Sequence, residues 1–141
     1  MSFISVLIVL VILSITVATG YLAISPAILG QKAEVSITRM EVLREGILRY
    51  KSNNAGALPA TLDVLVVPQS PACTADNNST SATFQSLKGW CGPYVDQTVQ
   101  QAVDEFKQDG WGTFIEYTPT TLKSCGPDRV CGNGDDIVLT I

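Results

Sequence analysis

The chain has 141 residues, of which 46% are hydrophobic and 16% are charged, and it carries a formal net charge of −4 with no histidine. The absence of histidine excludes Ser-His-Asp catalysis, Cys-His catalysis and histidine-bound metals. The acidic balance, without clustered lysine or arginine, argues against a nucleic-acid partner, because phosphate binding depends on grouped positive charge.

The first 31 residues contain no charged side chain, and every charged residue lies at or after Lys32. Within this region, residues 3–24 are apolar apart from a few serines and threonines and one glycine. As a helix they would extend about 33 Å, enough to cross a hydrocarbon core of about 30 Å. A cleaved secretory signal is the alternative, and the missing basic start disfavours it. Residues 1–31 are therefore expected to form a hydrophobic transmembrane helix.

The charges and the cysteines give opposite indications about which side of the membrane holds the rest of the chain. All basic residues follow the apolar stretch at residues 3–24, and the positive-inside rule then places the C-terminal region in the cytoplasm. Four cysteines without C-x-x-C spacing favour two disulfides, which persist in an oxidising compartment. The two observations agree if a basic leader precedes Met1 and is removed, so that the C-terminal domain is periplasmic.

Residues 32–53 are expected to continue the helix as an amphipathic segment, because apolar side chains recur there at steps of three and four. The apolar positions are Ala33, Ile37, Met40, Leu43, Ile47 and Tyr50. Pro26 and Gly30 predict a kink or an unwound turn near residues 20–30. The sequence Asn-Asn-Ala-Gly at residues 53–56 predicts the end of the helix.

Residues 54–141 are expected to form a small globular domain of mixed structure. Residues 56–66 predict a short helical turn, begun by a proline, that packs Leu62 and Leu65 on the long helix. Residues 68–86 predict an exposed loop, because they are rich in Ser, Thr, Asn and Pro. A helical stripe is expected to follow, formed by Val99, Ala102, Val103 and Phe106. Two strands are expected at residues 113–118 and 136–141, which are rich in β-branched and aromatic residues.

The four cysteines allow three pairings, and closure between neighbours in the sequence favours Cys73–Cys91 and Cys125–Cys131. A zinc site is the chemical alternative, but the spacings do not resemble paired zinc knuckles. A redox-active pair is also disfavoured, because it would have the C-x-x-C signature. Both bridges are therefore expected to stabilise the domain.

Three carboxylates lie within nine residues near the C-terminus, separated by glycines and one asparagine: Asp128, Asp135 and Asp136, with Asn133. Hard oxygen ligands of this kind are those that calcium prefers, and a glycine-containing loop can bring them together. In the alternative interpretation Asp135 occupies a turn, Asp128 pairs with Arg129 or Lys123, and the Cys125–Cys131 bridge holds the loop. The loop is a candidate calcium site.

The run MSFIS followed by an apolar stretch resembles the mature N-terminus of class III signal proteins, which include type IV pilins and type II secretion pseudopilins. The resemblance implies that a leader peptidase cleaves before Met1 and methylates its amine, and that Phe3, Ser5 and Pro26 take part in assembly. Ser5 stands where the family usually has a glutamate. A serine cannot neutralise a charged amine in apolar surroundings, which indicates a variant docking or a specialised subunit.

Four further stretches resemble those of major pseudopilins, so that the resemblance covers most of the chain. They are GALPATLDVLV at residues 56–66, GWCGPYV at 89–95, DGWGTFIEY at 109–117 and SCGPDRVCGNGDDI at 124–137. The last is similar to the family's calcium loop. The ligands that this similarity implies are the carboxylates of Asp128, Asp135 and Asp136, the side-chain oxygen of Asn133, and the backbone carbonyls of Cys125 and Val130.

The resemblance implies an α+β pilin fold, in which the long N-terminal helix packs on a small antiparallel sheet with a loop-rich C-terminal region. It also implies three parts: residues 1–31 as the transmembrane and filament-core helix, 32–53 as its amphipathic continuation, and 54–141 as the head. The expected function is that of a non-enzymatic subunit of a type IV pilus-like or type II secretion filament. The subunit would be stored in the bacterial inner membrane, polymerise with its own copies, and contact assembly and secretion machinery. The alternative is a monomeric, membrane-tethered periplasmic binding or inhibitor domain.

Overall fold

The computed structural model describes the backbone of residues 3–76, 86–96 and 104–141, and the side chains of these residues except 3, 4, 13, 15–27, 76 and 86. It shows an α+β protein with one long helix and small antiparallel sheets. In chain order the elements are α1 (Phe3–Asn53), η1 (Leu62–Leu65), β1 (Thr74–Asp76), β2 (Ser86–Lys88), η2 (Glu105–Lys107), β3 (Glu116–Tyr117), β4 (Thr121–Ser124) and β5 (Ile137–Thr140), where η marks a 3-10 helix.

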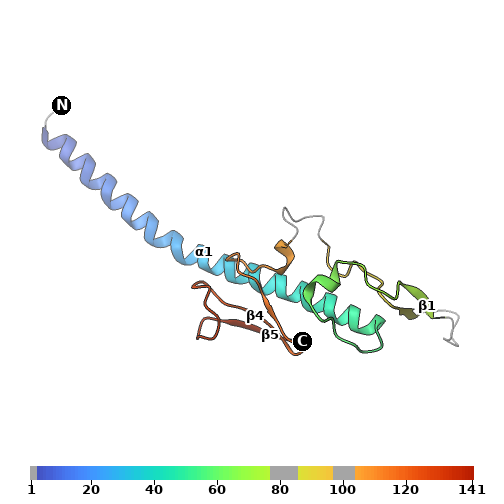
Figure 1. Cartoon of the computed structure of the whole chain (residues 1–141). Helices are drawn as coiled ribbons and strands as arrows, with labels where there is room; N and C mark the ends of the chain where they lie inside the picture. The colour runs from blue at the N-terminus through green and yellow to red at the C-terminus, as the bar shows by residue number, and fades with distance from the viewer. Residues whose placement is uncertain (1–2, 77–85, 97–103) are drawn as a thin grey trace.

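The helix α1 is continuous from Phe3 to Asn53. Its N-terminal half projects away from the rest of the protein, and its C-terminal half carries the other elements (Figure 1). Residues 20–30 are helical, so the prediction of an unwound turn there is wrong, and Figure 1 shows a gentle bend along the rod. A proline such as Pro26 removes one backbone hydrogen bond, and the turns on either side can keep the helix continuous.

The end of α1 and the segment after it follow the sequence prediction. Gly56 has a φ of 87°, in the left-handed region that favours glycine, and its N–H donates to the Lys51 carbonyl at 2.9 Å. The chain then reverses into η1, which contacts α1 and buries Leu62 and Leu65. The prediction of a short turn packed on the long helix is confirmed.

The hydrophobic core lies between the C-terminal half of α1 and the remaining elements. Met40, Leu43 and Ile47 of α1 have no exposed surface. They pack with Leu62, Leu65, Tyr94, Val95, Phe106, Ile115 and Leu122. Ile37, a predicted core position, is 42% exposed, and Ser36 is fully buried instead. The reason is geometric, because steps of four, three and four residues align Ser36 with the three apolar side chains on one helix face.

The strands β3, β4 and β5 form one antiparallel sheet in that order. β3 covers only two residues of the predicted strand 113–118, and β5 lies within the predicted strand 136–141. The sequence did not predict β4. It has only four residues, and its alternation of half-buried and buried positions is made partly by polar side chains.

The strands β1 and β2 form a separate antiparallel hairpin. β1 lies inside the predicted loop 68–86, so part of that prediction is wrong. Residues 74–76 form a strand because they pair with β2. Of the predicted helical stripe, Phe106 is buried in η2. Val99, Ala102 and Val103 lie outside the described residues.

A buried polar contact joins α1 to the loop that follows η2. The Ser36 hydroxyl donates to the Lys32 carbonyl at 2.8 Å and accepts the Gly110 N–H at 2.8 Å. A Cβ atom on Gly110 would lie 2.2 Å from the Lys32 carbonyl oxygen, so only glycine permits this approach. Arg39 adds an ion pair with Glu105, at 3.0 Å. The loop is therefore held directly against the helix backbone.

The Asp109 carboxylate organises the same loop from inside the protein. The residue is 1% exposed. One oxygen accepts the N–H groups of Trp111 and Thr113, at 2.9 and 2.8 Å, and the other accepts the Ser124 hydroxyl at 2.6 Å. Since Ser124 ends β4, this carboxylate connects the loop to the sheet. We call Ser36, Asp109, Gly110 and Ser124 the polar junction.

Candidate functional site

Near its start, α1 carries apolar side chains on every side. Seven consecutive residues are between 46% and 60% exposed: Val6, Leu7, Ile8, Val9, Leu10, Val11 and Ile12. Ser5, at the start of this run, is exposed as well. Seven consecutive residues make almost two helical turns and so cover the full circumference. Exposed apolar surface of this extent marks a site of contact with protein or membrane. We call residues 6–12 the apolar segment.

Only part of the predicted transmembrane helix is covered by described side chains. Among the described residues, no helical stretch is both long and apolar enough to span a membrane. The side chains of residues 15–27, including Pro26, lie outside that set, as do Met1 and Phe3. The predicted processing at Met1 and the roles of Phe3 and Pro26 in assembly therefore stay predictions.

The second candidate site is the loop between β4 and β5, which we call the acidic loop. It extends from Cys125 to Asp136. Its turn depends on Gly126, which has a φ of 70°, and a Cβ atom there would lie 2.5 Å from the Asp135 carbonyl oxygen. Only glycine combines this backbone conformation with such a close approach. Asp135 is exposed and Asp136 is half-buried, so the loop offers its carboxylates close to the surface.

Hydrogen bonds within the acidic loop occupy much of the predicted ligand set. Asp128 accepts the Val130 N–H at 2.8 Å and the Asn133 side-chain amide at 2.6 Å. The Asn133 oxygen accepts the Asp135 N–H at 3.3 Å. Asp136 accepts the Gly132 N–H at 2.7 Å through one oxygen. Its other oxygen is buried and has no hydrogen-bond partner among the described residues.

Both predicted cysteine pairs are bonded in the structure, and none of the four cysteines is free. Cys73–Cys91 ties the residue before β1 to the segment after β2. Cys125–Cys131 closes the first part of the acidic loop, with Cys125 only 5% exposed. The loop thus has a covalent closure in addition to its internal hydrogen bonds.

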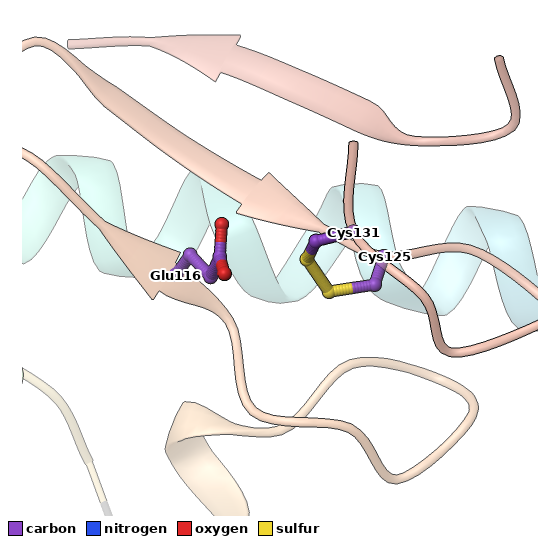
Figure 2. Close-up of side chains that lie close together, drawn as sticks. All are labelled: Glu116, Cys125 and Cys131. Atoms are coloured by element: carbon purple, nitrogen blue, oxygen red, sulfur yellow. A yellow bond between two sulfur atoms is a disulfide. The ribbon is translucent and has the colours of Figure 1, made fainter. Parts of the chain in front are cut away.

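A carboxylate that the sequence analysis did not single out lies beside the second bridge. Figure 2 shows Glu116 next to Cys125 and Cys131, and one atom of each lies within 4.8 Å of the others. Within the described chain this is the one such group of metal-type donors. Its sulfurs are bonded to each other, so it lacks the thiolates that a metal would need. The β3–β4 register pairs Glu116 with Lys123, and no sequence spacing indicated this position.

Lys123 forms an ion pair with Glu116 at 2.9 Å. The hydrogen bond to this carboxylate raises the pKa of Lys123 above its ordinary value, and the charge of Asp136 acts in the same direction. Lys123 therefore pairs with Glu116, not with Asp128 as one alternative supposed.

The fit of calcium to the acidic loop is good in chemistry and incomplete in geometry. The donors are hard oxygens, and the unpaired Asp136 oxygen is a group that a cation would satisfy. The carboxylate oxygens of the three aspartates do not all lie within 4.8 Å of one another, as the donor atoms of Glu116, Cys125 and Cys131 do. Ion binding would also require Asn133 to exchange its amide hydrogen bond to Asp128 for a contact through its oxygen. A rearrangement within the loop is thus part of the prediction.

Comparison of the chain with protein-family models, with curated protein sequences and with solved structures gives no match.

Proposed function

We propose that the chain is a structural subunit of a filament of the type IV pilus or type II secretion kind, held in the bacterial inner membrane before assembly. The observation that supports this most is the apolar segment. It projects from a folded domain (Figure 1) and exposes apolar side chains around its whole circumference. A helix of this kind requires a surrounding apolar medium, which lipid supplies first and neighbouring helices supply in the filament.

The mechanism is a transfer of one helix between two apolar environments. Moving apolar surface from lipid into a helix bundle changes the hydrophobic free energy little, because neither environment is water. Assembly machinery can then move subunits in either direction. The domain built on residues 32–141 stays outside the apolar core, in an oxidising compartment where its two bridges persist.

Ser5 is consistent with this transfer. A neutral hydroxyl costs far less to bury than an ionised carboxylate does. The first 31 residues therefore have no charged side chain that must be paired inside lipid or inside the filament. We propose that Ser5 makes docking depend on apolar packing, in contrast to a family glutamate.

Electron microscopy of material sheared from expressing cells tests the proposal. We expect filaments that contain this chain, and mass spectrometry of the subunit is expected to show a methylated Met1. Cells that hold the chain in the membrane, express the assembly machinery and yet form no filaments would instead support a monomeric tethered domain. A bacterial strain that lacks the gene is the control, because any filaments that it forms must consist of other subunits.

We also propose that the acidic loop binds calcium, with Asp128, Asp135 and Asp136 as carboxylate ligands. Calcium is expected to raise the melting temperature of the purified chain by several degrees, because binding to the folded state alone stabilises it. The rise should disappear in an Asp135→Ala variant and persist in an Asp104→Ala variant, which is altered outside the loop. A melting temperature that does not respond to calcium would contradict the proposal. The loop would then be held by the Cys125–Cys131 bridge and its internal hydrogen bonds.

A further inference from the structure

The two disulfides differ in what surrounds their sulfur atoms. Cys73 is exposed, as are its neighbours Pro71, Ala72, Thr74 and Ala75. Cys125 is 5% exposed, and Cys131 is half-buried. Cys91 is half-buried like Cys131, so Cys73 is the one cysteine of the four that is exposed and the easiest for an attacking thiol to reach.

Charge separates the two bridges as well. The Glu116 carboxylate has an oxygen within 4.8 Å of both sulfurs of Cys125–Cys131 (Figure 2). Thiol–disulfide exchange begins when an anionic thiolate attacks a sulfur, and it releases a second thiolate as leaving group. A fixed negative charge at this distance repels the attacking anion and destabilises the departing one.

Lys123 moderates this effect without removing it. Its ammonium pairs with one Glu116 oxygen at 2.9 Å, and the Glu116 side chain is still 53% exposed. The acidic loop contains three further carboxylates and one cationic side chain, that of Arg129. The formal charge of the acidic loop, Glu116 and Lys123 together is thus negative, and Glu116 is a carboxylate with an oxygen within 4.8 Å of both sulfurs.

We propose that the Glu116 carboxylate shields the Cys125–Cys131 bridge from thiol–disulfide exchange, so that external thiols open Cys73–Cys91 first. The reagent class is a small thiol or a dithiol oxidoreductase. Its thiolate attacks the exposed Cys73 sulfur, the Cys73–Cys91 bond breaks, and Cys91 leaves as a thiolate that takes up a proton. A second thiol then attacks the mixed disulfide, releases Cys73 as a thiol, and carries away the oxidising equivalents as its own disulfide.

The consequence is a modification site in the β1–β2 hairpin and a protected closure of the acidic loop. The hairpin lies at the far end of the domain from the projecting half of α1 (Figure 1), and Cys73 is not part of the hydrophobic core. Its bridge can open while the core and the acidic loop keep their structure.

The test measures the reduction of each bridge in the full-length, oxidised chain. Dithiothreitol is added at neutral pH, samples are quenched with an alkylating reagent, and mass spectrometry identifies the modified cysteines. We expect Cys73 and Cys91 to be modified at least tenfold faster than Cys125 and Cys131. Equal rates, or faster opening of the second bridge, would overturn the proposal.

Two matched variants separate the charge effect from a loosened structure. Glu116→Gln keeps the size of the side chain, leaves Lys123 as an uncompensated cation, and should accelerate reduction of Cys125–Cys131 about three- to fivefold. Lys123→Gln leaves the carboxylate uncompensated and should slow it. Both differences should shrink at high salt. Loss of structure would accelerate reduction in both variants, so changes in the same direction would refute the electrostatic shield.

Discussion

A Leu10→Lys variant is expected to lose both filament assembly and stable retention in the membrane. Leu10 is 60% exposed, the highest value in the apolar segment. A lysine in the interior of a membrane helix costs about 3 kcal/mol on insertion scales, roughly a hundredfold in partitioning. In the filament core the same ammonium would be buried without a partner, which is at least as unfavourable. Membrane fractionation and electron microscopy measure the two effects separately.

Leu48→Lys is the matched control for this substitution. Leu48 is an exposed leucine of the same helix, at 43% exposure, but it belongs to the domain and lies outside the apolar segment. We expect this variant to enter the membrane normally. If the Leu10→Lys variant also remains in the membrane and forms filaments, the apolar segment is not buried in either state, and the proposed function is wrong.

An Asp109→Ala variant is expected to lose about 3–5 kcal/mol of the free energy of unfolding. The Asp109 carboxylate accepts three hydrogen bonds in a site that is almost completely buried. Alanine leaves two backbone N–H groups and the Ser124 hydroxyl without their acceptor. A typical small domain has 5–15 kcal/mol in total, so this loss would unfold a large fraction of molecules. Urea denaturation of the purified chain in detergent measures the difference.

Asp104→Ala, at the other end of η2, provides the comparison. The Asp104 side chain is 54% exposed and pairs with Lys107 at 2.8 Å. A single pair with an exposed carboxylate contributes about 1 kcal/mol or less, and Lys107 keeps its ion pair with Asp63 at 2.7 Å, so the midpoint of unfolding should change little. Similar losses for the two variants would mean that the polar junction does not hold the domain together. Asp109→Asn should lie between them, because it keeps one acceptor oxygen for the backbone donors.

The accuracy of the sequence analysis depended on how local each feature is. The end of α1 near Gly56 and the η1 turn were predictable, because capping and a short helical turn need only neighbouring residues. The cysteine pairs followed from closeness in the sequence. The strand β4 was missed, because four residues with polar members carry little signal outside their sheet. Ser36 was missed as a core residue for a related reason. Helix geometry places it on the buried face, but a serine reads as polar, and the N–H of Gly110 that its buried hydroxyl accepts lies 74 residues away.

The order of residues along the chain sets where this protein is apolar and where it is charged. The uncharged first 31 residues, the helical period and the glycine-rich acidic loop all follow from residue order. Which distant groups meet depends on the folded arrangement of the elements. The β3–β4 register placed Glu116 beside the second bridge, and the polar junction connected Asp109 to Ser124. The physical reason is that periodicity and turns act over a few residues, whereas strand register and burial are set by packing of the whole chain.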